Sequence, residues 1–235
     1  MTDLVRYERR DTVALITLDD GKANALSPAM VAAVNAAFDR AEDDAASAVV
    51  LTGRPGRFSA GFDLSVMAAG PDALFGLVKS GAELALRLYL FPRPLVIACT
   101  GHALAAGAVL LCAADLRLGT TGEFKIGLNE VAIQLPLPVF AMELARERLA
   151  PRYFSQAVTQ ARIFNPAGAV EAGYLDAVAA PDALLDEALA HATRLGALPD
   201  PAFRLTKERE RRETVARIRA TLDADIASLT APVPA

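Results

Sequence analysis

The sequence predicts an α/β fold, built from ββα-like units and followed by a mostly helical C-terminal region. The first observation is that two stretches, residues 48–91 and 95–114, each begin with a short apolar run and end in a helical pattern. Repetition of this kind indicates buried strands with covering helices. The second is that the pattern after Pro138 is mostly helical. With 53% hydrophobic residues among 235, the chain can bury a substantial core.

The first predicted elements are a hairpin and a capped helix. Residues 4–8 and 12–18 alternate or run apolar around a turn-like Arg-Arg-Asp segment. Ser27 followed by Pro28 gives the residues that helices prefer at the N-cap and at the first helical position. The helix keeps a 3.6-residue apolar period as far as Asp44.

The remaining elements follow from the same two periodicities. Glycine and proline predict an irregular loop over residues 53–64, and Pro92 and Pro94 must end the helix that precedes them. Asn165 is a preferred N-cap and Gly173 a preferred helix stop. The predicted elements are, in order, a strand over 48–52, a helix over 71–91, a strand over 95–98, a buried helix over 109–114, a strand over 115–119, helices over 139–149, 152–160 and 166–172, a strand over 175–178, and helices over 182–195 and 200–229.

A tight turn of small residues joins the strand at 95–98 to the buried helix after it. Small residues at such a junction allow close packing, and they also let backbone N–H groups approach a ligand at a helix end that favours negative charge. Spacing alone leaves both interpretations open. The turn contains Gly101, Ala103, Ala105, Ala106 and Gly107.

Composition argues against several classes of partner. A net charge of −4 disfavours a nucleic-acid surface, and the basic cluster over 207–219 is interleaved with glutamates, which is typical of a solvated helix face. The longest apolar run, residues 103–114, is shorter than the roughly 20 residues that a membrane span needs. We therefore expect neither nucleic acid nor a membrane as partner. Residues 1–10 lack the pattern of a secretory signal, so we expect a cytoplasmic location.

Cysteine and histidine usage indicates buried thiols and no metal site. Cys99 and Cys112 both lie in apolar surroundings, which favours free buried thiols over a disulfide. Two histidines and two cysteines at these spacings do not form a convincing metal cluster.

Three segments together resemble the crotonase superfamily, the enoyl-CoA hydratase and isomerase family. They are Lys-Ala-Asn-Ala-Leu-Ser at 22–27, Phe-Ser-Ala-Gly-Phe-Asp-Leu at 58–64, and the stretch 94–117 with 124–131 behind it. The resemblance covers nearly the whole chain. It implies the crotonase-like (ClpP/crotonase) spiral of ββα units and an acyl-CoA substrate, and the Gly-Leu-Asn-Glu form at 127–130 is similar to the Δ3,Δ2-enoyl-CoA isomerases.

The resemblance also implies the catalytic residues. Family members hold a thioester carbonyl between two backbone N–H donors, so that an enolate is stabilised. Matching the motifs assigns these donors to Ala60 and to Ala106, where the family usually has glycine. Related hydratases have two glutamates; the later one is retained as Glu130, whereas the earlier position is Val109, which cannot pass a proton.

The leading hypothesis is therefore an enzyme that shifts the double bond of an enoyl-CoA from position 3 to position 2, with Glu130 as acid and base. A hydratase with an unidentified second acid is the alternative, and sequence leaves Glu83, Glu123 and Glu143 open for that role. Hydrolysis or another enolate chemistry, and a non-catalytic acyl-CoA-binding protein, also stay open. Asp63 is more naturally a structural residue of the loop than a catalytic one. His102 is expected to serve packing or a hydrogen bond to a ligand rather than proton transfer.

Substrate contacts and assembly are likewise implied by the resemblance. The residues expected to contact the substrate are Lys22, Ala23 and Ala25 at the adenine and pantetheine, Phe62, Asp63 and Leu64 in the binding loop, Phe203 and Lys207 in the final helix, Arg54 or Arg57 at phosphates, and Met67, Leu74, Phe75 and Val78 at the acyl chain. Coenzyme A enters as part of the substrate, and no other cofactor is expected. We expect a homotrimer or a hexamer formed by two trimers.

Two regions are predicted from these considerations. Residues 1–180 form the crotonase core with the CoA and active sites, and residues 181–235 form a helical region for oligomerisation. The long final helix could fold back on its own core or pack on a neighbouring subunit. The resemblance favours the neighbouring subunit.

Overall fold

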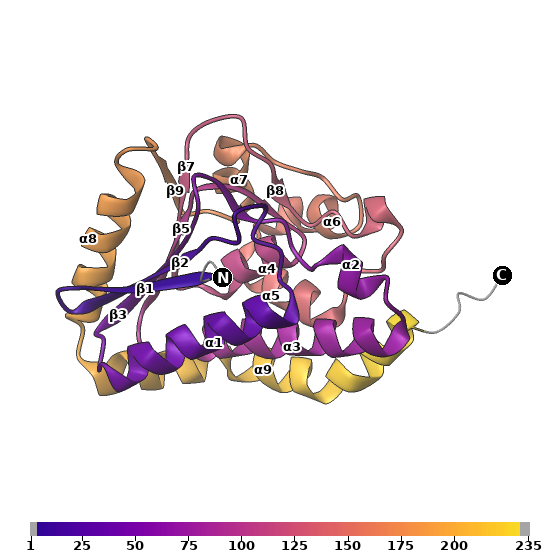
Figure 1. The fold of residues 1–235 in the computed structure, drawn as a ribbon, viewed down its shortest axis with the longest axis horizontal. Helices are drawn as coiled ribbons and strands as arrows, with labels where there is room; N and C mark the ends of the chain where they lie inside the picture. Colours follow the sequence, from indigo (N-terminus) through magenta and orange to yellow (C-terminus); the bar gives the residue numbers. More distant parts are fainter. Residues whose placement is uncertain (1–3, 231–235) are drawn as a thin grey trace.

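The computed structural model describes residues 4–230 and contains two sheets with helices around them (Figure 1). The larger sheet has the strand order β1-β2-β3-β5-β7-β9, and the smaller sheet has the order β4-β6-β8. β1 pairs antiparallel with β2, whereas the other neighbours are parallel. The strands are β1 (Val5–Arg10), β2 (Val13–Leu18), β3 (Ala48–Gly53), β4 (Gly56–Ser59), β5 (Leu95–Cys99), β6 (Gly101–Leu104), β7 (Leu116–Thr120), β8 (Ile126–Gly127) and β9 (Ala177–Ala179).

The helices connect and cover these sheets. They are α1 (Pro28–Asp43), α2 (Leu64–Met67), α3 (Pro71–Leu90), α4 (Ala106–Ala113), α5 (Val139–Arg148), α6 (Pro151–Val158), α7 (Pro166–Ala172), α8 (Leu184–Gly196), α9 (Asp200–Thr230) and the 3-10 turn η1 (Val131–Ile133). Within the described residues, none of these helices combines the length and apolar character needed to cross a membrane.

The predicted α/β class with repeated ββα units is confirmed. In each unit the first strand joins the larger sheet, the second joins the smaller sheet, and helices follow. The pairs β3-β4, β5-β6 and β7-β8 follow this rule. The strands β3 and β5 are buried along their whole length because helices cover both faces of a parallel sheet, which explains their uniformly apolar sequences.

The two faces of the larger sheet pack against different helices. Ala188 and Ala192 of α8 pack with Val50 and Val96 on one face. The other face belongs to the main core, which includes α1, α3 and α4. Figure 1 shows α8 on the side of the sheet away from α4. The second face thus meets the elements that surround the cavity described below.

Local signals at helix ends are confirmed by the structure. The Ser27 hydroxyl accepts a hydrogen bond from Met30 N at 3.2 Å, and Pro28 begins α1. Asn165 caps α7 by accepting from Gly168 N at 2.8 Å, and Gly173 ends that helix at φ 96°. Such side-chain caps are local, so a sequence pattern predicts them well.

Two predicted connections are wrong, because each contains a strand. The stretch 53–64 includes β4, and the expected tight turn after β5 is β6. Their glycines serve the crossing between the two sheets: a Cβ at Gly101 would lie 2.1 Å from the carbonyl carbon of Gly56. Glycine here permits a close backbone approach rather than a turn. The buried helix also begins at Ala106, earlier than predicted, and β9 begins later than the strand expected at 175–178.

The final helix folds back on its own core, which is the alternative that the resemblance did not favour, and its packing on a neighbouring subunit stays a prediction. α9 packs along α3 and α5 of its own chain. Its buried apolar residues are Val215, Ile218, Leu222 and Ile226. Both α8 and α9 of the region 181–235 therefore pack on the rest of the chain, and the role of that region in oligomerisation stays a prediction. Residues 1–3 and 231–235 of the two predicted regions lie outside the described residues.

The basic cluster over 207–219 is not simply a solvated face. Lys207 and Arg211 are 5% and 3% exposed, and both pair with Asp115 at 2.7 Å. Burial lowers the pKa of Lys207 to about 8, although Asp115 opposes this shift. Asp115 also accepts from Leu95 N at 2.7 Å, so it ties α9 to the start of β5. The partner carboxylate is distant in sequence, and the charge pattern of the helix alone could not show it.

Cys99 and Cys112 are free and buried, as predicted. Cys112 belongs to α4, every residue of which is buried. The Cys99 thiol donates to Gly101 O at 3.3 Å, within the crossing between the sheets. Both thiols therefore serve packing.

Candidate active site

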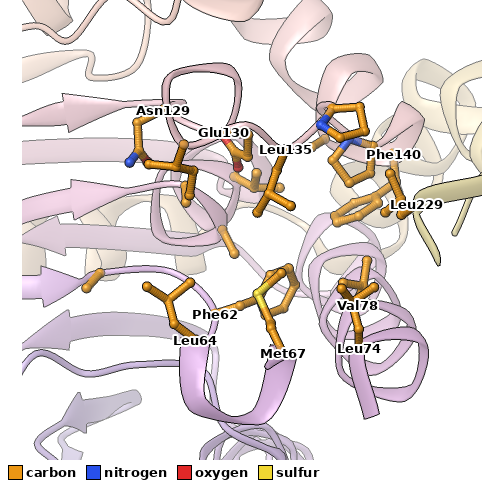
Figure 2. A pocket seen from close by; sticks show the side chains of 18 residues that line it. Phe62, Leu64, Met67, Leu74, Val78, Asn129, Glu130, Leu135, Phe140 and Leu229 are labelled. Atoms are coloured by element: carbon orange, nitrogen blue, oxygen red, sulfur yellow. The ribbon is translucent and has the colours of Figure 1, made fainter. Parts of the chain in front are cut away.

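A cavity of about 150 Å³ lies between the start of α4, the helices α2 and α3, the segment after β8, and the end of α9 (Figure 2). Its walls are almost entirely apolar. The lining residues are Ala60, Phe62, Leu64, Met67, Leu74, Val78, Ala105, Ala106, Val109, Asn129, Glu130, Ile133, Leu135, Pro136, Pro138, Phe140, Ala141 and Leu229.

Glu130 carries the one titratable side chain among the described residues that line this cavity. It lies directly before η1, and its Oε2 is buried without a hydrogen-bond partner in the described chain. Burial raises the pKa of Glu130 to about 7, while backbone N–H groups of Glu130 and Asn129 partly oppose the shift. A carboxyl group with such a pKa can both accept and donate a proton near neutral pH.

The other candidate carboxylates do not line the cavity. Val109 is buried and lines the cavity at the position where the resemblance places the earlier glutamate of related hydratases. Glu143 is buried in α5 but pairs with Arg217 at 2.8 Å and with Arg146 at 3.6 Å. Glu83 and Glu123 are exposed. Among described residues, the cavity therefore holds a single carboxylate.

The N-terminus of α4 presents an available backbone donor to the cavity. Ala106 is its first residue, and the Ala106 N–H donates no hydrogen bond within residues 4–230. The preceding Ala105 has the unusual backbone angles φ 51° and ψ −127° and gives no side-chain cap. Ala106 itself is not among the described residues with positive φ, so its methyl group fits where related proteins usually have glycine.

The assignment of Ala60 as a second donor does not fit the structure. The Ala60 N–H already donates to Ala23 O at 3.0 Å. Two positions on, the Phe62 N–H donates no hydrogen bond within the described residues, and Phe62 lines the cavity. A Cβ at the intervening Gly61 would lie 3.1 Å from Ala106 N, so this segment and the start of α4 are in close contact. Phe62 and Ala106 are therefore the pair of available donors.

Asn24, which sequence reasoning quoted only as part of a motif, holds this arrangement together. Its side chain is fully buried and donates to Leu18 O, Arg57 O and Phe58 O at 3.0 to 3.1 Å. It also accepts from Asp20 N at 3.0 Å, and it adopts φ 52°, which asparagine tolerates. Asn24 thereby fixes the loop whose Ala23 carbonyl holds Ala60.

Two glycines set the position of the donor segments. A Cβ at Gly107 would lie 2.4 Å from Ser59 O, so glycine allows α4 to approach the end of β4. A Cβ at Gly81 of α3 would lie 2.2 Å from the Phe62 ring, so the absence of a side chain at Gly81 leaves the space that the ring fills. Packing of that ring on α3 restrains the Phe62 backbone.

Only some of the residues expected to contact the substrate line the cavity. Phe62, Leu64, Met67, Leu74 and Val78 line the cavity, whereas Phe75 does not. Asp63 caps α2 by accepting from Ser65 N and Ser65 Oγ at 2.9 and 2.6 Å, and these bonds lower its pKa. Its observed role is therefore structural. Lys22, Ala23 and Ala25 lie in the loop fixed by Asn24, and Lys22 is exposed.

Two further groups lie away from the cavity. Phe203 and Lys207 line a separate hollow beside Asp115. Arg54 pairs with Asp19 at 3.6 Å and donates to Lys22 O at 3.1 Å, while Arg57 is exposed. His102 accepts from Lys125 N at 3.0 Å and contacts Phe124 edge to face, in keeping with a packing role. Contact of these cations with a substrate stays a prediction.

Comparison with known proteins identifies the family. The sequence profile described as "Enoyl-CoA hydratase/isomerase" matches residues 8–233. The chain belongs to the enoyl-CoA hydratase/isomerase family. Its resemblance to the crotonase superfamily, first seen in three motifs, is thereby confirmed.

The relatives of this family member include proteins named isomerases and proteins named hydratases. It is 31% identical to human mitochondrial enoyl-CoA delta isomerase 1 over 95% of this chain and 75% of that protein. It is 31% identical to a putative enoyl-CoA hydratase of Thermus thermophilus over 87% and 82% of the two chains. A solved family structure from Pseudomonas syringae is 42% identical, with a TM-score of 0.94, covering 97% of this chain and 99% of that one. Family membership alone therefore leaves the exact reaction open.

Proposed function

We propose that this family member is an enoyl-CoA isomerase that converts 3-enoyl-CoA into 2-enoyl-CoA. The observation that carries the proposal is that Glu130 is the single carboxylate among the described residues of a mostly apolar cavity, which also presents two available backbone N–H donors. Moving a double bond needs one proton taken away and one returned. A single carboxylate suffices for both transfers.

The proposed reaction proceeds through a dienolate. The Glu130 carboxylate removes a proton from C2 of the 3-enoyl thioester, and the electron pair of that C–H bond becomes delocalised onto the thioester oxygen. The N–H groups of Phe62 and Ala106 stabilise the negative charge on that oxygen; in other enzymes one such donor contributes about 3 to 4 kcal/mol. Glu130 then returns the proton to C4, which leaves the double bond between C2 and C3 and regenerates the carboxylate.

The environment of Glu130 suits this cycle. Burial raises its pKa to about 7, so that the carboxylate is a stronger base than an exposed glutamate and its conjugate acid still gives the proton back. The apolar walls restrict water, which would otherwise compete for the dienolate. Hydration needs an activated water and a proton donor together, and Val109 provides neither function.

The test is to follow conjugated 2-enoyl-CoA by its ultraviolet absorbance after addition of a 3-enoyl-CoA. We expect turnover by the natural protein and a loss of at least about a hundredfold in Glu130→Gln. Glu143→Gln is the matched control, because Glu143 is a buried glutamate outside the cavity, and it should retain most of the activity. Full turnover by Glu130→Gln would refute the assigned role.

The same preparation discriminates the alternatives. Water addition to crotonyl-CoA as fast as isomerisation would favour a hydratase. Tight binding of CoA thioesters without turnover of any enoyl, hydroxy or dienoyl thioester would favour a non-catalytic binder. We also propose a homotrimer or a hexamer, on the resemblance alone, which sedimentation equilibrium tests directly.

A further inference from the structure

The end of α9 forms part of the wall of the catalytic cavity. Leu229 lines the same cavity as Glu130 although 99 positions separate them in the numbering. Figure 2 places Leu229 and Phe140 on one side of the cavity and Asn129 and Leu64 on the other. The helix that sequence analysis assigned to a neighbouring subunit thus contributes to its own chain's cavity.

Burial along the cavity gives it a direction. Leu64 is 64% exposed, whereas Val78 and Phe140 are each 2% exposed. The thioester and its CoA must reach solvent, so the exposed Leu64 side is the entrance. An acyl chain held at Glu130 then points toward the buried side formed by Val78 and Phe140, where the half-buried Leu229 meets its far end.

Contacts from the last turns of α9 hold this wall in place. Asp225 Oδ2 accepts from Val139 N at 2.7 Å and so caps α5, whose own N-cap, Pro138, gives no side-chain bond. Asp223 pairs with Lys79 of α3 at 2.7 Å. α9 therefore bridges the two helices that flank the buried side, and the Leu229 side chain is carried on a restrained turn.

We propose that Leu229 sets the maximum length of the acyl chain that the cavity accepts. The inference rests on one part of the proposed function, the binding of acyl-CoA, and does not depend on the shift of the double bond. Each methylene that enters an apolar site strengthens binding about fourfold, so affinity should rise with chain length until the chain reaches Leu229 and should then level off or fall.

Substitutions at Leu229 should move that limit in opposite directions. Leu229→Ala removes three carbon atoms and should admit two or three further methylenes, which strengthens binding of the next longer acyl-CoAs by roughly 20- to 60-fold. Leu229→Phe should shorten the limit by one or two methylenes. Opposite shifts from two variants of one residue distinguish a length limit from a general loss of stability.

The experiment is calorimetric titration of saturated acyl-CoAs from about four to sixteen carbons, because binding of saturated chains needs no turnover. Leu205→Ala is the matched control: Leu205 lies on α9, is 41% exposed and does not line the cavity. We expect the length limit to move in both Leu229 variants and to stay in Leu205→Ala. An unmoved limit with short acyl-CoAs still bound would overturn the role of Leu229 and leave the proposed function standing. Failure of every acyl-CoA to bind the natural protein would overturn both.

Discussion

Glu130→Gln should stabilise the folded protein at alkaline pH while it abolishes catalysis. Burial raises the pKa of Glu130 from its ordinary 4.5 to about 7. Between pH 4.5 and about 7, the folded state therefore keeps a proton on Glu130 that the unfolded state releases. The free energy of unfolding falls as the pH rises through this range. Since a tenfold change in an equilibrium constant is about 1.4 kcal/mol, the ionised Glu130 costs about 3 kcal/mol above pH 7. A neutral glutamine avoids that cost.

The assay is urea unfolding of both proteins at pH 5 and at pH 8. Integration over the window predicts that the stability of Glu130→Gln relative to the natural protein increases by about 2 to 3 kcal/mol between the two conditions. Glu83→Gln is an exposed control on α3, and its effect should change by less than about 0.5 kcal/mol. An equal effect of Glu130→Gln at both pH values would refute the argument, because it would mean that Glu130 is not desolvated in the folded protein.

Three other outcomes follow from the site. kcat/KM for a 3-enoyl-CoA should fall about tenfold per pH unit below about 7 and level off above it, because Glu130 must be ionised to remove the first proton; a flat profile from pH 5 to 8 contradicts this. Asn24→Ala should lower the free energy of unfolding by about 2 to 4 kcal/mol, measured in urea, because it removes the side-chain donor that bonds Leu18 O and Phe58 O in buried positions and Arg57 O in a part-buried one. Gly81→Ala should displace the Phe62 ring and lower kcat by roughly tenfold. Gly76→Ala on the same helix is the control: nothing lies within 4 Å of the added methyl group, so this variant should keep kcat and stabilise the protein by about 0.5 to 1 kcal/mol. Equal kcat in both variants would exclude this role of Gly81.

Elements with local causes were predictable from the sequence. The Ser27 cap and the Pro28 start of α1 are set by side chains a few residues apart, and the buried strands show as apolar runs. β4 and β6 were not predictable because their glycines serve a crossing of two sheets, which is a tertiary requirement. The burial of Lys207 likewise depends on Asp115, which lies 92 positions away.

The residues of the candidate site were likewise predictable only in part. The motifs led to Glu130 and Ala106 and to the absence of an acid at Val109. They placed the other donor at Ala60, because a motif names a residue type and does not show which N–H is already bonded. The hydrogen bond from Ala60 to Ala23 joins two separate segments, and it leaves Phe62 as the available group.

The cap that Asp225 gives to α5 affects the order of folding. Its carboxylate lies 86 positions after Val139, so the first turn of α5 obtains this hydrogen-bond acceptor only after nearly all of α9 has been synthesised. During translation the sheets can pair and bury their cores earlier, because the strands β1 to β7 precede α5 in the chain. The cavity, which Leu229 of α9 helps to line, is therefore completed late, and a nascent chain without α9 exposes part of its apolar wall. Such exposed apolar surface makes a partly folded chain prone to aggregate until α9 docks.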